Sequence, residues 1–515
     1  MTSDIRARAS QTREASQKLI KLSSEERANI LETMAKSLIA NQKQIVTENA
    51  KDMALAQKQN IVPSLIKRLA LTPKKLQELA NGIRAIAKDK EPIGKILRRT
   101  QIAEDLIVRQ ETVPFGVLLV IFESRPDCLP QVPCLFLVAI FHHEKQRPLC
   151  FVCIEKKIAS LAVRSGNGLL LKGGSEAYHS NHILHQLLSD AIFEASEGRV
   201  PKSLLGLIEN REEISQVLKL EDAIDLIIPR GSSSLVKYIQ NNTKIPVLGH
   251  AEGICHLFVD ECVGNTVTID DVIDIVLDAK LNYPAACNAV ETLLLHENLF
   301  CQHNNSSNKH GQSENNFTVA PAMKIIATLR MVFVFLKTTE GFFFWKLQYK
   351  GVKLFGDESI RRIVISPEIP PLLHGYHHEY SDESLSVVVV RSLQEAILHI
   401  NRYGSGHTET IVTENLDHAR EFAQQVDSAC VFHNASTRFA DGFRLGLGAE
   451  VGISTGKLHC RGPMGVDGLL TTRWIMSSQR AQGHCVGDFD EQNANTKRAA
   501  TYIHKDLMSV LSRND

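Results

Sequence analysis

The chain lacks several features that would mark a membrane, secreted or nucleic-acid-binding protein. No apolar run approaches the roughly 18 to 20 residues of a membrane span, and the longest cover only residues 135–141 and 331–336. Lys plus Arg and Asp plus Glu each number 58, so the formal charge is zero. This balance argues against binding to nucleic acid or a membrane surface as the main function.

Secretion signals are also lacking. The first residues show no apolar segment of a signal peptide. The 11 cysteines follow no regular spacing in this large chain, which is typical of reduced thiols in an intracellular protein. We therefore expect a cytoplasmic protein, with a plastid location left open.

The length and residue pattern indicate several α/β domains. A chain of 515 residues is too long for one core, so we expect two or three domains. Helical spacing dominates residues 1–100, with helix starts at Ser23 and at Thr72. Residues 98–122 then change to β-branched, alternating sequence.

Strand and helix patterns alternate after residue 113. We expect strands at 113–122, 168–172, 223–228, 245–248 and 254–259, and helices at 175–193 and 232–239. This alternation predicts a doubly wound α/β sheet, which binds ligands at the carboxyl ends of its strands. Two glycine turns fall at such ends, at Lys172-Gly173-Gly174 and Arg230-Gly231-Ser232. Although each alone fits an ordinary turn, the repetition indicates a nucleotide site.

Cys287 is the candidate nucleophile. It follows Tyr283-Pro284-Ala285-Ala286, whose proline favours a loop and whose small side chains leave room for a substrate carbonyl. A thiolate there could attack an acyl carbon and form a thioester. Taken by itself, the residue fits a buried structural cysteine better, and only the rest of the chain favours a nucleophile.

Five segments of the chain resemble one family in order and in register. They are VIFESRPD at 120–127, RSGNGLLLKGG at 164–174, YPAACN at 283–288, HNASTRFADG at 433–442 and GLGAEVG at 446–452. Together they are similar to γ-glutamyl phosphate reductases (glutamate-5-semialdehyde dehydrogenases) and to the C-terminal half of plant pyrroline-5-carboxylate synthases. The resemblance covers nearly the whole chain.

The resemblance implies an aldehyde-dehydrogenase-like α/β fold. It would have a doubly wound cofactor domain at 1–253, an α/β catalytic domain at 254–432, and a return to the cofactor domain with an oligomerisation tail at 433–515. Residues 98–113 would form an oligomerisation ribbon, and the chain would be a homo-oligomer. No metal is implied, and a Cys150–Cys153 pair without a second pair does not predict one.

The resemblance also implies an activity, namely NADPH-dependent reduction of L-glutamyl 5-phosphate to L-glutamate 5-semialdehyde in proline biosynthesis. Cys287 would carry the thioester, and its backbone N–H with the Asn288 side chain would stabilise the oxyanion. NADP would contact Lys172, Gly173, Ser175, Arg230, Gly231, Ser232 and Glu379. The substrate would contact Ser124, Arg125, Asn434, Ser436, Thr437 and Arg438, because arginine suits its carboxylate and phosphate. Glutamate 5-kinase is an expected partner.

Two segments depart from the family pattern. Residues 133–158 divide what the family has as one helix, and residues 301–346 replace a shorter helical stretch. Because both interrupt family-like sequence abruptly and have foreign composition, we interpret them as translated introns or mispredicted exons. A mature transcript encoding both would contradict this hypothesis.

Two other functions stay open at this point. A catalytically impaired or misassembled chain could act only as an assembly partner. An aldehyde-oxidising dehydrogenase would need a carboxylate base for a hydrolytic water, and the sequence does not identify one.

Overall fold

The computed structural model describes residues 2–59, 69–122, 152–209, 212–300, 320–329, 336–338, 341–343, 351–363, 369–372, 374–447, 449–490, 492 and 498–508. Ser124 and Arg125 lie outside these ranges, as do residues 133–151 and most of 301–346.

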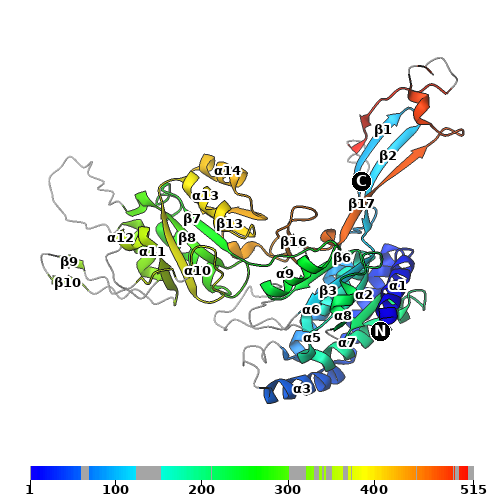
Figure 1. Ribbon diagram of the computed structural model, residues 1–515, viewed down its shortest axis with the longest axis horizontal. Helices are drawn as coiled ribbons and strands as arrows, with labels where there is room; N and C mark the ends of the chain where they lie inside the picture. The colour runs from blue at the N-terminus through cyan, green and yellow to red at the C-terminus, as the bar shows by residue number, and fades with distance from the viewer. Residues whose placement is uncertain are drawn as a thin grey trace.

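The first part of the chain builds a parallel sheet covered by helices on both faces (Figure 1). The strands run in the order β5-β4-β3-β6, and their bounds are β3 Val117–Phe122, β4 Gly168–Lys172, β5 Leu205–Ile208 and β6 Leu226–Arg230. The helices are α1 Thr2–Leu19, α2 Ser24–Ala40, α3 Gln42–Lys58, α5 Pro73–Lys88, α6 Val152–Arg164, α7 Tyr178–Ala195, α8 Glu212–Val217 and α9 Ser233–Asn242. Short 3₁₀ turns are η1 Ser175–Ala177 and η2 Lys202–Leu204.

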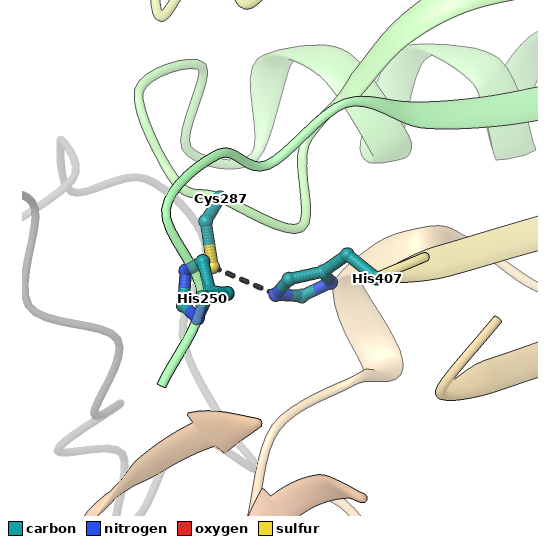
Figure 2. Close-up of side chains that lie close together, drawn as sticks. All are labelled: His250, Cys287 and His407. Carbon is teal, nitrogen blue, oxygen red and sulfur yellow. Dashed lines mark hydrogen bonds between the residues drawn. The ribbon is translucent and has the colours of Figure 1, made fainter. Parts of the chain in front are cut away.

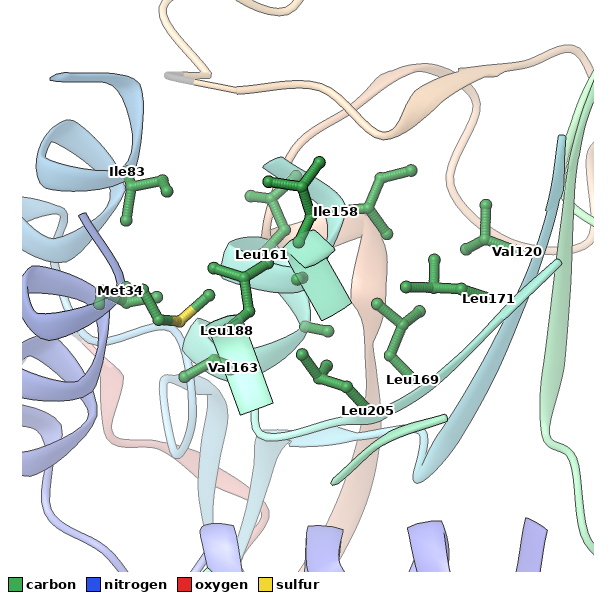
Figure 3. Close-up of a cluster of buried hydrophobic side chains, with 14 of the residues drawn as sticks. Met34, Ile83, Val120, Ile158, Leu161, Val163, Leu169, Leu171, Leu188 and Leu205 are labelled. Atoms are coloured by element: carbon green, nitrogen blue, oxygen red, sulfur yellow. The ribbon is translucent and has the colours of Figure 1, made fainter. Parts of the chain in front are cut away.

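Alternating strand residues fill a core on each face of this sheet. On β3, Val120 packs with α2, α5, α6 and α7, whereas Leu119 faces α1, α8 and α9. Figure 3 shows the first core, in which Leu169 and Leu171 of β4 lie near Leu161 of α6. Because both faces are covered, the strands are apolar up to Lys172 and Arg230, the last residues of β4 and β6.

Cys287 lies beside the second parallel sheet. The order of this sheet is β11-β12-β8-β7-β13-β14, with β7 Cys255–Val259, β8 Val290–His296, β11 Lys353–Gly356, β12 Ser384–Val390, β13 Thr408–Val412 and β14 Cys430–His433. The helices α10 Ile269–Leu281, α11 Pro321–Leu329 and α12 Glu358–Ile363 cover one face, and α13 Leu393–Tyr403 and α14 Leu416–Gln425 cover the other. Leu257 and Val259 face the first group, while Phe258 faces the second.

An antiparallel ribbon projects from the first sheet (Figure 1). Its order is β17-β2-β1-β18, with β1 Ile96–Ala103, β2 Leu106–Pro114, β17 Leu470–Ser478 and β18 Lys505–Asp506. Smaller elements are β9 Leu336–Thr338, β10 Gly341–Phe343, β15 Gly452–Ser454 and β16 Gly462–Met464, with η3 Glu297–Phe300, η4 Thr437–Phe439, η5 Asp467–Leu469 and η6 Val486–Phe489. The fold class expected from the sequence is confirmed by the two parallel α/β sheets.

The local predictions hold in most places. Ser23 caps α2 with Glu26 in a capping box, and Thr72 caps α5. The strand expected at 223–228 lies instead at Leu226–Arg230, after a turn. The strand expected at 245–248 is wrong, because only Val247 pairs, in one bridge to Ile227. The neighbouring Pro246 has no N–H to donate, so the pairing does not extend.

Candidate active site

Cys287 lies in the loop between α10 and β8. The Ala286 N–H donates to the Tyr283 carbonyl at 3.0 Å, and the Ala289 N–H to the Ala286 carbonyl at 2.8 Å, so the loop turns tightly. Gly253 presses against it from the segment before β7. A Cβ added at Gly253 would lie 2.2 Å from the Cys287 carbonyl oxygen and 2.5 Å from its Cα, so only glycine fits there.

His407 is the direct partner of the cysteine. Its Nε2 lies 2.9 Å from Cys287 Sγ (Figure 2), and its Nδ1 lies 2.8 Å from Thr408 Oγ1. The His250 ring meets His407 edge to face at a centroid distance of 4.9 Å, and its Nδ1 lies 2.9 Å from the Ile453 carbonyl oxygen. His407 is not among the site residues predicted from the sequence. Its only sequence signal is a histidine directly before a buried strand.

Burial sets the protonation of this pair. It raises the pKa of the Cys287 thiol well above its usual value, and Glu379 acts in the same direction while Arg230 opposes it. Burial also lowers the pKa of His407 well below its usual value. The resting pair is therefore a neutral thiol and a neutral imidazole.

Two anions and two cations act on the thiol electrostatically, namely Glu379, Glu450, Arg230 and Arg438. Glu379 Oε2 accepts the Gly253 N–H at 2.9 Å, and burial raises its pKa. Arg438 is only 7% exposed, and burial lowers its pKa to about 10. The two guanidinium groups give the site a means of receiving an anionic substrate.

The first expected cofactor contact lies at the end of β4. Lys172 is the last residue of that strand, and its buried Nζ donates to the Gly173 carbonyl oxygen at 2.6 Å. Ser175 begins the 3₁₀ turn η1 that leads into α7. The chain therefore carries a cation and a turn at a carboxyl end of the sheet, where α/β proteins bind ligands.

The second expected cofactor contact lies at the end of β6. Arg230 ends the strand, Gly231 follows, and Ser232 caps α9 by accepting the Leu235 N–H at 3.4 Å. The same Arg230 acts electrostatically on Cys287, so this edge of the sheet faces the thiol. Since β4 and β6 both flank β3 in parallel, the two contacts lie along one edge.

The expected substrate residues lie after β14. Ser436 caps η4 by accepting the Arg438 N–H at 3.2 Å, and Thr437 beside it is buried. The Asn434 amide bonds the backbone of Thr413 in both directions, at 2.9 Å each, and so it fixes the chain where φ is +52°. These contacts are structural, and the substrate role of the group stays a prediction.

Asn288 joins the nucleophile loop to this turn. Its Nδ2 donates to the Ala440 carbonyl oxygen at 2.8 Å, and its side chain is buried. The structure therefore brings Cys287, Asn288, Arg438, Arg230 and Glu379 together, and it places Lys172 and Ser232 along the carboxyl edge of the first sheet. Within the ranges described above, no helix is long and apolar enough to cross a membrane.

No family model matches the chain, but curated proteins match it over nearly its whole length. The chain is 46% identical over 503 residues to Delta-1-pyrroline-5-carboxylate synthase B of Arabidopsis thaliana, a match that covers 98% of this chain and 58% of that protein. It is 39% identical over 500 residues to the γ-glutamyl phosphate reductase of Prochlorococcus marinus (strain MIT 9515), with 97% of this chain and 96% of that protein covered. The chain thus spans a little over half the length of the plant protein and nearly all of the bacterial one.

Solved structures agree with these relatives. The γ-glutamyl phosphate reductase of Thermotoga maritima is 30% identical with a TM-score of 0.75, covering 92% of this chain and 98% of that one. An acetylating aldehyde dehydrogenase of Geobacillus thermoglucosidasius (15% identical, TM-score 0.57) and an NADP-dependent glyceraldehyde-3-phosphate dehydrogenase of Bacillus halodurans (14%, 0.58) share the fold alone. The two parallel sheets and the half-buried thiol therefore define an aldehyde-dehydrogenase-like protein. The chain belongs to the γ-glutamyl phosphate reductase family.

Proposed function

We propose that the chain reduces L-glutamyl 5-phosphate to L-glutamate 5-semialdehyde and phosphate with NADPH, the second step of L-proline biosynthesis. The observation that carries the proposal is the 2.9 Å contact between Cys287 Sγ and His407 Nε2 in a chain of this family. The substrate follows from the names of the relatives and from the resemblance in sequence.

The thiol–imidazole pair supplies the nucleophile. As Sγ attacks the acyl carbon, its proton passes to His407 Nε2, which is neutral and therefore able to accept it. Thr408 Oγ1 at Nδ1 holds the ring in this orientation. A carbon–sulfur bond forms, the acyl carbon–oxygen bond to phosphate breaks, and phosphate leaves.

Donors beside the sulfur stabilise the developing oxyanion. The backbone N–H of Cys287 and the Asn288 amide are the candidates in the described chain, with Asn288 held by Ala440. Arg438 is the cation that we propose binds the phosphate or the substrate carboxylate. His407 returns its proton to Sγ when the carbon–sulfur bond breaks.

The carboxyl edge of the first sheet, where β4 and β6 end, carries groups that suit a dinucleotide. Lys172 and the Ser232-capped start of α9 suit phosphate groups, and the buried Glu379 carboxylate suits a ribose hydroxyl near the thiol. Gly173, Ser175, Arg230 and Gly231 complete the proposed contacts. NADPH supplies, when bound, the hydride that reduces the thioester carbonyl. The preference for NADPH over NADH rests on the resemblance.

Partners and location complete the proposal. L-glutamyl 5-phosphate is an acyl phosphate that water hydrolyses, so we propose that glutamate 5-kinase delivers it at close range.

We also propose a homo-oligomer, because the ribbon exposes Trp474 and Met476. The cytoplasm remains our proposed location.

The test runs the reaction in reverse, as phosphate-dependent reduction of NADP with pyrroline-5-carboxylate. Cys287→Ala should remove all turnover, and His407→Ala should lower kcat by about 10² to 10⁴, the usual contribution of a general base. Cys485→Ala, at an exposed thiol, should not change the rate. Turnover without phosphate would indicate aldehyde oxidation instead. A folded chain without turnover that still captures glutamate 5-kinase would indicate an assembly partner.

A further inference from the structure

We propose that His250, Cys287 and His407 form a binding site for a thiophilic divalent cation, with zinc as the preferred ion, and that the bound ion blocks the nucleophile. The block of catalysis rests on the proposed function, whereas binding of the ion does not. The three side chains are drawn together in Figure 2.

The geometry of the three donors fits one ion. One sulfur and two imidazole nitrogens lie within 4.8 Å of one another. His407 offers Nε2, which faces the sulfur, while its Nδ1 contacts Thr408 Oγ1. His250 Nδ1 contacts the Ile453 carbonyl oxygen, so the proposed site uses Nε2 of this ring. Such bonds at the second nitrogen orient metal-binding histidines in many proteins.

The distances require only a small adjustment. Zinc binds thiolate sulfur at about 2.3 Å and imidazole nitrogen at about 2.0 to 2.1 Å, so tetrahedral ligands lie about 3.6 Å apart. The Sγ–Nε2 distance of 2.9 Å must therefore widen somewhat, which a side-chain rotation can supply. Three protein ligands leave a fourth position for water.

The donor set selects the ion. Thiolate and neutral imidazole favour zinc over magnesium or calcium, which prefer oxygen. Arg230 and Arg438 act electrostatically on the sulfur with one sign, and Glu379 and Glu450 with the other, so two charges of each sign surround it. Binding releases the thiol proton to solvent and forms a zinc–sulfur bond, so no other reactant is needed.

Zinc and the acyl group compete for the same sulfur. A thiolate that coordinates zinc is a poor nucleophile towards an acyl phosphate, and His407 Nε2 can no longer accept a proton. We therefore expect reversible inhibition that a chelator relieves. The ion would also protect Cys287 from alkylation, which gives a readout independent of turnover.

A second group provides a matched comparison. Asp260, Cys262 and His418 also place ligand atoms within 4.8 Å of one another. There, however, Asp260 Oδ2 already accepts from Thr413 Oγ1 at 2.6 Å and lies 2.8 Å from His418 Nδ1. Zinc at this group would not touch the nucleophile.

The experiment uses the full chain stripped of metal and titrated with buffered zinc. Alkylation of Cys287 by iodoacetamide is measured in wild type, His250→Phe and His418→Phe. The phenylalanine at 250 retains a ring beside His407 but removes the ligand nitrogen. We expect zinc to protect Cys287 in wild type and in His418→Phe, with at least tenfold more zinc required in His250→Phe.

Cobalt supplies a second measurement that does not depend on the His250 variant. In Cys262→Ser, which removes the thiol of the second group, bound cobalt should give a thiolate-to-metal charge-transfer band that disappears when Cys287→Ser is added. Protection that is unchanged in His250→Phe, or a band that persists in the double variant, would overturn the inference. Protection with the expected pattern in a chain that lacks reductase turnover would support the zinc site and reject only the proposed function.

Discussion

At the scale of single residues, the charges around Cys287 decide how readily its thiol loses a proton. Burial and Glu379 both raise the pKa of the thiol, and Arg230 opposes them. The thiolate is therefore scarce until His407 accepts the proton during attack. Such a thiol reacts slowly with unselective electrophiles and is protected from oxidation.

Removing the Glu379 charge should make the thiol more reactive. Alkylation requires the thiolate, so its rate rises with pH through the raised thiol pKa. In Glu379→Gln that pKa falls, and the alkylation profile should shift to lower pH, with a rate increase of about three- to tenfold near pH 8. Iodoacetamide kinetics across pH measure this, with the exposed Glu383→Gln as control. An unshifted profile would show that Glu379 does not act on the sulfur.

Gly253 should tolerate no side chain. Because its Cβ would lie 2.2 Å from the Cys287 carbonyl oxygen, Gly253→Ala must displace the nucleophile loop. We expect kcat/KM to fall by about 10², as for ångström-scale misplacement of a reacting group. Gly456→Ala is the control, since its nearest neighbour is Ser454 Oγ at 3.6 Å. Steady-state kinetics on both variants test this, and equal losses would contradict the steric argument.

The candidate site was only partly readable from sequence. Cys287 is a sequence candidate because its neighbours are small and its loop contains a proline, but only the family resemblance favours it over a structural cysteine. His407 could not be found, because it lies 120 residues further along and meets Cys287 only through the fold. The structural use of the Asn434 amide was equally hidden, since it depends on the backbone of Thr413.

At the scale of elements, a buried ion pair closes the base of the nucleophile loop. Lys280 in the last turn of α10 donates to Glu291 Oε2 at the start of β8, at 2.8 Å, and both side chains are fully buried. The Tyr380 N–H donates to the same oxygen at 3.2 Å. The pair therefore joins the two elements between which Cys287 is held, and it lies beside the segment that carries Glu379.

Breaking this pair on one side should be costly. Lys280→Met leaves Glu291 buried without its cation, and we expect the free energy of unfolding to fall by about 3 to 5 kcal/mol. Urea denaturation followed by fluorescence measures the change. The double variant Lys280→Met with Glu291→Met should recover most of the loss, since apolar side chains of similar volume often replace a buried pair. If the double variant is as unstable as the single one, packing rather than charge is responsible.

Elements were more predictable than contacts between them. Helix starts carry local signals, and the capping box at Ser23 and Glu26 lies where the sequence indicated. Four apolar residues in a row resemble a strand whether they pair along their whole length or at one residue. The single bridge of Val247 to Ile227 therefore could not be predicted from the local sequence.

At the scale of the whole molecule, the antiparallel ribbon projects from the first sheet and exposes large apolar side chains. The side chains of Trp474 and Met476 on β17 are 54% and 60% exposed. Large apolar side chains on a projecting sheet are typical of a subunit contact. The proposed homo-oligomer would cover them.

Polar residues at these positions should reduce the assembly. We expect the double variant Trp474→Ser with Met476→Ser to shift to a smaller species at micromolar concentration, because the apolar area lost weakens association. Light scattering coupled to size-exclusion chromatography measures the mass. Leu398→Ser, at a 70% exposed residue of α13, is the control. An unchanged mass in the double variant would remove the ribbon from the interface.

The pairing of β17 with β2 also affects how the chain is made. Gln110 and Thr472, whose side chains bond across these strands, are 362 residues apart. At about 5 to 20 residues per second, the ribosome needs roughly 20 to 70 s to add that length. Throughout this interval the edge of β2 that will receive β17 remains open in the nascent protein, and open strand edges attract foreign strands. We therefore expect that this edge must be protected during synthesis, although β17 covers it in the folded chain.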